Sequence, residues 1–550
     1  MKTKNILLGM IAAVLLSFTA CNDFNVLNDG TINRPDDNMF DFDRATLGMT
    51  IRRGIDLNFN RGGGQVGAAH LHERIKNLTV DFYSHYLNPS GNWSTRNYIP
   101  NNGWNEDYWE AHYQWLGDLN LIILAGSDMN GQEIESRINN VQIARIMRVF
   151  IQSQATDFFG PIPFPAPGQT AEEIHYIALA DQYNEFFSEL DEAVKKMDRK
   201  LPIIGTDDPV YFGNFDKWQQ FANSLRLRLS LKLSEVNTAL CAEQAKAALN
   251  APGGLMQPGS DAQLPGTTGW GNAYNYFMYQ VSWGEKMSLT TSFEKVLTGI
   301  GGIAYNGTAN VYPAVVDPRG SRFFDPSVNN KEWKGVFPGL SNENHINVGP
   351  NHSFMSEIYI LPNDKRKIDC FLYEEVCFLL AEAYHRGFIP GGEAKAKEAY
   401  EAGIKSSLDR WGVGGDAGAY LASTAKNKWG TSAAYDDANG AGNTKLEKII
   451  TQKYIAGYPD LAYQAWNDKR RLNLPAFDVP QQRNEAVGFS NANTNIKDAS
   501  NFINRQPFPQ SQTSLNKANY EKGVQLLGGR DDIKTNLWWD KDMNYITSVQ

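Results

Sequence analysis

Cysteine is scarce in this chain of 550 residues, which contains four. Cys370 and Cys377 are seven positions apart, so on a helix their Cα atoms would lie about 10 Å from each other. That separation exceeds the roughly 7 Å that a disulfide bond spans, so we expect both to be small buried residues. Cys241 stands alone. A secreted chain without a disulfide framework must depend on a sizeable core.

Signatures of catalysis are also missing. The sequence contains no G-x-S-x-G, no P-loop, no H-E-x-x-H and no G-x-G-x-x-G at the start of a helix. His70 and His72 form the one close histidine pair, but they would face away from each other on a helix, and no third ligand is evident. The run 436–440 (DDANG) offers oxygen atoms without calcium-loop spacing. We expect no enzyme, no cofactor and no metal, although paired carboxylates for glycoside cleavage depend on three-dimensional separation and stay open.

Basic residues are outnumbered, because 52 Lys and Arg face 61 Asp and Glu and give a formal net charge of −9. An acidic surface repels phosphate, which argues against a nucleic-acid partner. The one long apolar run lies at residues 6–16, and it is shorter than the roughly 20 residues that cross a bilayer. This run follows Lys2 and Lys4 and ends in small residues before Cys21, a pattern typical of a signal peptide.

Cys21 would be the first residue of the mature chain, which indicates the lipid-attachment site of a bacterial lipoprotein. Phe18, three positions before the cleavage point, departs from the usual Leu, and an ordinary secreted protein with an incidental Cys21 is the alternative. We predict a signal peptide at 1–20, a lipidated polar tether at 21–38 and a single body at 39–550. The lipid would be the only membrane attachment of that body.

Apolar periodicity in the body predicts a mostly α-helical fold built from about four tetratricopeptide-like helix pairs. The helical repeats are expected at about 71–250 and 368–475. Individual helices are predicted at 137–159, 181–198, 239–250, 370–411 as a hairpin, and 444–472 as a further pair. Residues 216–234 fit a helix or an alternating strand, and their length and lack of β-branched residues favour a helix.

Residues 251–366 lack periodicity and are dense in Gly, Pro, Asn and aromatic residues. We predict an irregular ligand lobe here, with short strands near 303–312 and 358–361. Loops of this length are usually functional.

Exposed aromatic rings are the candidate ligand-binding groups, because Trp and Tyr faces stack on the C–H faces of sugar rings while short polar side chains bond the hydroxyls. One cluster lies in the Gly- and Asn-rich stretch 88–106 and another lies in the irregular lobe. Packing inside the fold is the competing interpretation for each ring. The predicted ligand-binding residues are Asn92, Trp93, Arg96, Trp104, Trp270, Tyr274, Trp283 and Trp333.

Several strings, in this order, resemble the SusD/RagB family of outer-membrane nutrient-binding lipoproteins. They follow the lipoprotein cysteine Cys21 and are 144–148 (ARIMR), 157–163 (DFFGPIP), 317–319 (DPR), 375–383 (EVCFLLAEA), 445–454 (KLEKIITQKY), 465–471 (AWNDKRR), 505–511 (RQPFPQS) and 538–540 (WWD). The resemblance covers nearly all of the mature chain. It implies four tetratricopeptide-like pairs that hold a loop-rich ligand lobe.

The resemblance also implies a function. Members of this family are surface lids on SusC-like TonB-dependent transporters and bind oligosaccharide or, less often, oligopeptide between lid and barrel. We therefore expect a lipid-anchored, outer-membrane, glycan-capturing protein, with the same lid role for oligopeptides or a surface glycosidase as alternatives. The basic run 469–471 could indicate an anionic ligand, but we expect it to pair with carboxylates inside the fold.

Overall fold

The computed structural model describes residues 40–57, 71–89, 93–128, 130–265, 287–341, 350–356 and 367–549, and the side chains of 40–43 and 89 are excluded from the description. Among the predicted features, Cys21, Asn92, Trp270, Tyr274, Trp283 and the strand near 358–361 therefore lie outside the described residues.

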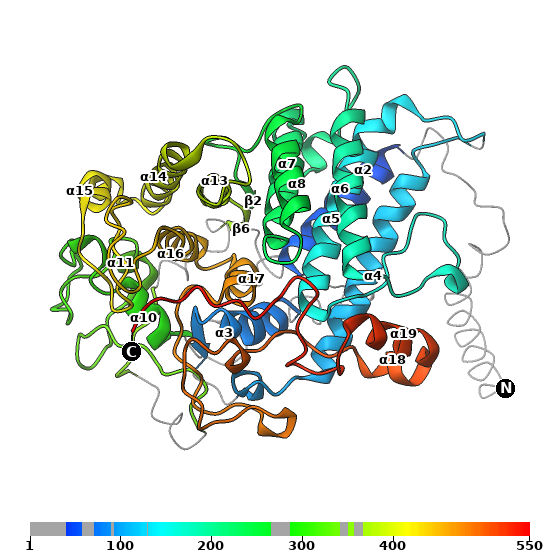
Figure 1. Cartoon of the computed structure of the whole chain (residues 1–550). Helices are drawn as coiled ribbons and strands as arrows, with labels where there is room; N and C mark the ends of the chain where they lie inside the picture. The colour runs from blue at the N-terminus through cyan, green and yellow to red at the C-terminus, as the bar shows by residue number, and fades with distance from the viewer. Residues whose placement is uncertain are drawn as a thin grey trace, which may run out of the picture.

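Long antiparallel helices build the first half of the body (Figure 1). They are α2 (Phe40–Asp56), α4 (Asn102–Leu124), α5 (Ile138–Phe159), α6 (Leu179–Lys196), α7 (Phe215–Lys232) and α8 (Thr238–Asn250). Consecutive helices from α4 to α8 pack on each other, and α2 packs against α4 and α5. Asparagine side chains at 101, 214 and 237 cap the first turns of α4, α7 and α8 by accepting backbone N–H bonds.

The ambiguous segment is the helix α7. Leu225, Leu227, Leu229, Leu231 and Leu233 are all 0–1% exposed. Their alternation does not indicate a strand here, because α7 packs against α6, α8 and α13 (Tyr373–His385) and is covered on nearly every side. A helix that is buried all round carries apolar residues all round.

The second half continues with helix pairs. The hairpin of α13 and α14 (Gly392–Arg410) is followed by α15 (Ala417–Ala422), α16 (Lys445–Gly457) and α17 (Ala462–Leu472), and the chain ends with α18 (Gln510–Leu515) and α19 (Lys517–Leu527). The predicted pairs are confirmed, because α5 packs on α6, α7 on α8, α13 on α14 and α16 on α17. The predicted start at 370 is wrong: Cys370 lies in strand β6 (Ile368–Phe371), and Leu372 is the N-cap of α13. Cys241, Cys370 and Cys377 are free and buried, as expected.

Short strands tie the irregular lobe to the helices. β1 (Leu87–Pro89), β3 (Met287–Leu289), β5 (Phe354–Met355) and β4 (Phe324–Asp325) form an antiparallel sheet in that order, and β2 (Ala262–Leu264) pairs with β6. No strand forms among the described residues 303–312; isolated bridges join Ala304 to Val315 and Thr298 to Val316 instead. Short helices complete the described chain: the π-helix η3 (His72–Val80), α3 (Asp81–Tyr83), α10 (Thr291–Leu297), α11 (Gly320–Phe323), and the 3₁₀ turns η4 (Ser94–Asn97), η5 (Glu135–Arg137), η6 (Ala171–Glu173), η7 (Gly205–Asp207), η10 (Ile300–Gly302), η12 (Gly414–Asp416), η13 (Glu485–Val487) and η14 (Ala499–Asn501).

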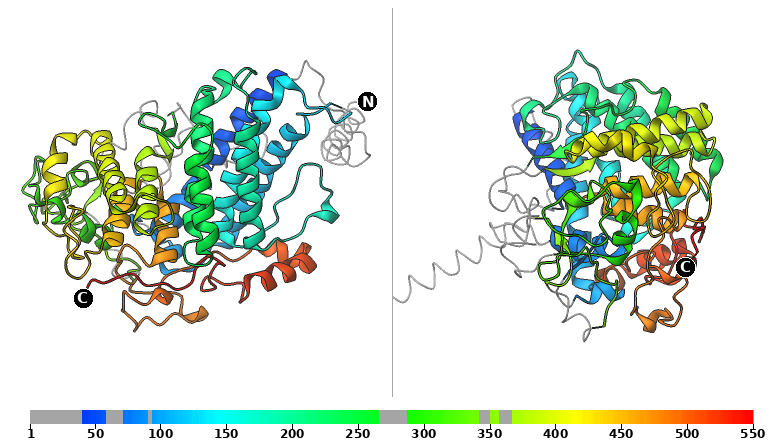
Figure 2. Two further views of the ribbon diagram at one scale, coloured as in Figure 1. Left: turned by 45° about the horizontal axis from the view of Figure 1, so that its top comes forward. Right: turned by 90° about the vertical axis from the view of Figure 1, so that its left-hand side faces the viewer.

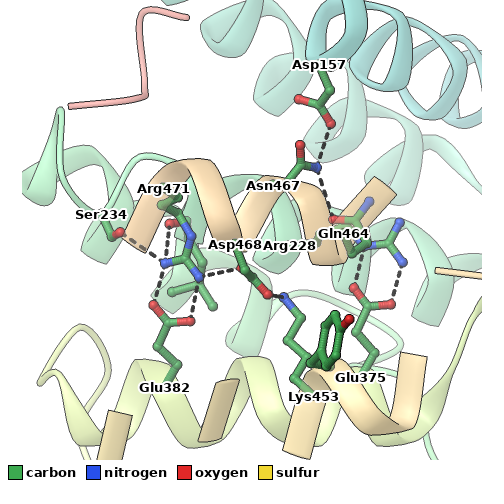
Figure 3. A network of polar contacts seen from close by, with 12 residues as sticks. Asp157, Arg228, Ser234, Glu375, Glu382, Lys453, Gln464, Asn467, Asp468 and Arg471 are labelled. Carbon is green, nitrogen blue, oxygen red and sulfur yellow. Dashed lines mark hydrogen bonds and ion pairs between the residues drawn. The ribbon is translucent and has the colours of Figure 1, made fainter. Parts of the chain in front are cut away.

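The two helical halves, seen from two further sides in Figure 2, meet at a buried ionic network that Figure 3 shows from close by. Arg471 of α17 is 1% exposed and donates to both oxygens of Glu382 of α13, at 2.5 and 2.9 Å. It also pairs with Asp468 at 2.8 Å, and Lys453 of α16 reaches the other oxygen of Asp468 at 2.9 Å. Arg228 of α7 forms a second bidentate ion pair, with Glu375 of α13.

In this network, charge pairing affects the pKa of Glu382 more than burial does. Burial alone would raise the pKa of Glu382, but the charge and hydrogen bonds of Arg471 lower that pKa to about 2. The expected carboxylate pairing of the basic run 469–471 is confirmed for Arg471. It is wrong for Lys469, whose ammonium lies 4.0 Å from the centre of the Phe502 ring and bonds the carbonyl of Pro475.

We predict that Glu382→Gln destabilises the protein by about 3–5 kcal/mol, because it leaves the Arg471 guanidinium buried without its full counter-charge. Urea unfolding followed by circular dichroism measures this loss. Glu398→Gln is the matched control, since Glu398 pairs with Lys395 on the surface with 67% of its side chain exposed; that change should cost less than about 0.5 kcal/mol. Equal losses for the two variants would contradict a structural role for the network.

Candidate ligand-binding surface

Two tryptophan rings flank the start of α4. Trp93 precedes η4, and Trp104 lies in the first turn of α4, where its backbone N–H is capped by the Asn101 side chain at 3.2 Å. The ring centroids lie 5.8 Å apart, with the planes at 48°. Both rings are half-buried and pack on the main core with one side. Each ring is therefore partly supported by the core and partly accessible to solvent.

A buried tyrosine anchors the turn that carries Trp93. Tyr98 has a left-handed backbone (φ 61°) and is 1% exposed, with its ring 5.8 Å from Tyr83 and 5.4 Å from Phe489. The Thr95 hydroxyl donates to the carbonyl of Leu78, which ties the same turn to η3. Tyr98 is buried, whereas its neighbour Ile99 is 46% exposed.

Asn97 joins this turn to two distant segments. Its side-chain amide donates to the carbonyls of Gly339 at 3.2 Å and Gln482 at 3.1 Å, and more distantly to that of Leu340. Phe337, 38% exposed, lies two residues before Gly339. We call Trp93, Asn97, Ile99, Trp104 and Phe337 the Trp93 surface. Four of its five side chains are apolar, and the fifth is the amide that holds the 337–340 segment to the turn.

Arg96 has a different position from the one predicted. It is 3% exposed, and burial lowers the pKa of its guanidinium to about 10. Its Nε donates to the Oδ1 of Asn97 at 3.2 Å. Since that oxygen accepts from Arg96, the Asn97 Nδ2 is the atom that faces the three carbonyls. Arg96 therefore orients the Asn97 amide from the buried side and is not itself exposed on the Trp93 surface.

Trp333 is also not on a surface. It is 2% exposed, 6.0 Å from the Phe324 ring and 6.4 Å from the Tyr305 ring. The prediction of a ligand contact at Trp333 is wrong because this ring is packed in the main hydrophobic core. Phe337 lies in the same predicted lobe and is 38% exposed, and Ile99, which is not among the predicted residues, is 46% exposed.

Two other candidate sites among the described residues are already filled by ion pairs and hydrogen bonds within the fold. A cavity of about 240 Å³ lies between α4, α5 and α6, but its Arg145 and Arg148 already bond Glu189. The run 436–440 lies near the buried ammonium of Lys448, which donates to Ser432 and Asn443. No group of three His, Cys, Asp or Glu side chains suited to a metal ion occurs among the residues that the structure describes.

The fold and the surface together define a class of protein, a helical-repeat protein that presents half-buried tryptophans beside a loop-rich lobe. Residues 64–540 match the family model described as SusD-like, Susd and RagB outer membrane lipoprotein. The chain therefore belongs to the SusD/RagB family. No curated protein matches it. Among the described helices, none is long and apolar enough to cross a membrane.

Solved structures agree with this assignment. A SusD homologue from Parabacteroides distasonis is 40% identical, with a TM-score of 0.85 over 92% of this chain and all of the other. A homologue from Bacteroides vulgatus is 26% identical, with a TM-score of 0.75 over 91% of this chain and 98% of the other. A chitin-binding SusD homologue from Flavobacterium johnsoniae is 25% identical, with a TM-score of 0.73 over 92% and 99%. The mostly helical, tetratricopeptide-like fold class is thereby confirmed.

We predict that Asn97→Ala loosens the segments around the Trp93 surface, because it removes the amide that holds the carbonyls of 339 and 482. Hydrogen exchange by mass spectrometry should show about tenfold faster exchange in peptides covering 94–99 and 336–341, the effect of losing roughly one hydrogen bond. Asn329→Ala is the control, since it removes an exposed Asn329–Asn351 bond. Unchanged exchange in Asn97→Ala would show that the segments hold together without this amide.

Proposed function

We propose that this protein is a surface-exposed nutrient-binding lipoprotein that captures oligosaccharide and delivers it to a SusC-like TonB-dependent outer-membrane transporter. The observation that carries the proposal is the Trp93–Trp104 pair, two half-buried rings in contact. Trp93 lies on a turn fixed by Tyr98 and Asn97, and Trp104 lies in the first turn of α4. Family membership supports the outer-membrane lipoprotein part of it.

The chemistry of the surface suits sugars. A sugar ring offers an apolar C–H face, and an indole that is immobilised on one side can stack on that face without a further loss of rotamer freedom. Neutral amide groups beside the rings match hydroxyls as donors and acceptors. The named residues of the Trp93 surface include no Asp, Glu, Lys or Arg, so a neutral glycan needs no desolvated charge there.

Membrane attachment is proposed through a lipid on Cys21, with residues 1–20 removed as a signal peptide. Residues 22–39 then separate the lipid from α2. A single acyl chain holds a protein weakly, whereas two or three chains, as on a bacterial lipoprotein cysteine, hold it stably. Cys21→Ser would leave the mature protein without this anchor.

The chitin-binding relative from Flavobacterium johnsoniae suggests the first ligand to test, an oligomer of N-acetylglucosamine. We infer that the protein binds such a glycan without cleaving it, so new reducing ends should not form. Oligopeptide is the alternative ligand, and it would be held through backbone hydrogen bonds rather than stacked rings.

We predict that Trp93→Ala and Trp104→Ala each weaken glycan affinity by about tenfold or more, because each removes a stacking face at the centre of the contact. Isothermal titration calorimetry with an N-acetylglucosamine hexamer and a panel of neutral oligosaccharides measures this. Phe212→Ala serves as the control: Phe212 is an aromatic residue that is 64% exposed outside the Trp93 surface. Binding of a hexapeptide panel instead of glycans would favour the alternative, and equal affinity in all variants would remove the Trp93 surface from ligand binding.

A further inference from the structure

Two exposed glutamines lie directly beside the Trp93 surface. The backbone N–H of Gln481 donates to the carbonyl of Pro338 at 2.9 Å, and that of Gln482 donates to the carbonyl of Gly339 at 2.8 Å. The carbonyl of Gln482 accepts from the Asn97 amide at 3.1 Å. One set of hydrogen bonds therefore joins the two glutamines to the turn that follows Trp93 and to the segment that carries Phe337.

The backbone at the glutamines is held from both sides. Gly339 has a left-handed backbone (φ 66°), and a Cβ atom there would lie 2.8 Å from the Cβ of Pro480 and 2.9 Å from the carbonyl oxygen of Gln482. Only glycine permits this close approach. On the other side, Arg483 is 4% exposed and donates to the carbonyl of Ser490 at 2.5 Å. The two glutamines are thus presented at a fixed place.

These two side chains differ from the other amides of residues 481–495, which serve the loop itself. Gln481 and Gln482 are both exposed, and no hydrogen bond holds either side chain among the residues that the structure describes. Two neutral amides on a fixed backbone, without a bond in the fold, are available for a ligand. The amides that accept backbone N–H bonds within the loop are Asn484, Asn491, Asn493 and Asn495.

The glutamines lie at the far end of the turn from the first tryptophan. Trp93 is the N-cap of η4 and Asn97 is its last residue, so the two are about 8 Å apart along the turn at 2.0 Å per residue. A ligand that contacts both the tryptophan rings and the glutamines must therefore extend beyond the sugar that is stacked on the rings. A primary amide has two N–H donors and a carbonyl acceptor, which match sugar hydroxyl and acetamido groups without the desolvation of a charge.

We propose that Gln481 and Gln482 are further ligand-binding residues, which bond the hydroxyl or acetamido groups of sugar units beyond those stacked on Trp93 and Trp104. This inference rests on the proposed glycan capture at the Trp93 surface and adds a dependence on chain length to it. A short oligosaccharide contacts the tryptophans alone, whereas a long one also contacts the two amides. The glutamines thereby favour long chains over short ones.

The test compares the dimer and the hexamer of N-acetylglucosamine by isothermal titration calorimetry on the mature chain, with the dimers and hexamers of cellulose, amylose and laminarin as further probes. The double variant Gln481→Ala/Gln482→Ala should bind the hexamer about tenfold more weakly, the effect of losing roughly two hydrogen bonds. Its affinity for the dimer should stay unchanged. Trp93→Ala should weaken both ligands. Gln525→Ala is the matched control, since Gln525 is an exposed amide on α19, and it should change neither affinity.

Wild-type affinity of the double variant for the hexamer would overturn the inference. An equal loss for dimer and hexamer would also overturn it, because the glutamines would then act at the tryptophans or through the fold. The thermal midpoint of the double variant should equal that of the wild type, and a lowered midpoint together with lost affinity would contradict a direct contact. Wild-type protein that binds none of the hexasaccharides would contradict the proposed function itself, and that outcome is visible before any variant is made.

Discussion

The bidentate ion pair between Arg471 and Glu382 is the constraint on which the described body depends. It joins α17 to α13 in a region where neither side chain meets water, so each charge is stable there only while the other is present. Asp468 extends the pair to Lys453 of α16, and Arg228 with Glu375 adds α7. These directional contacts fix the position of the two helical halves relative to each other. Apolar packing alone would define that position less strictly.

The Trp93 surface, the proposed ligand-binding surface, is held in place by several buried contacts. Tyr98, Thr95 and Asn97 fix the Trp93 turn to η3, to the 337–341 segment and to the loop at 482, while Trp104 is built into the first turn of α4. The two tryptophan rings are therefore in contact without a ligand. Binding would carry little additional entropy cost for ordering them.

Periodicity was sufficient to predict α5 to α8, the α13–α14 hairpin and the α16–α17 pair, because an amphipathic or fully buried helix leaves its pattern in local sequence. It predicted no helix at α2, α18 or α19. Even α7, with its alternating leucines, followed from length and residue type. Exposure at single positions was not predictable in this way. Trp333 and Phe337 lie four residues apart in one loop-rich stretch, yet one fills a core and the other is exposed, and the difference depends on partners such as Phe324 that come from elsewhere in the fold. Arg96, predicted to face the ligand, is buried and orients Asn97 for the same reason.

The central claim is that a preformed pair of tryptophans captures glycan on a rigid helical frame, and fluorine NMR of protein containing 5-fluorotryptophan tests it most directly. During titration with an N-acetylglucosamine hexamer or another bound oligosaccharide, the resonances of Trp93 and Trp104, assigned by single Trp→Phe variants, should shift with a common dissociation constant. Those of Trp466 and Trp539, 1% and 0% exposed, should stay in place. Shifts confined to other tryptophans, with Trp93 and Trp104 unmoved at saturation, would contradict the account.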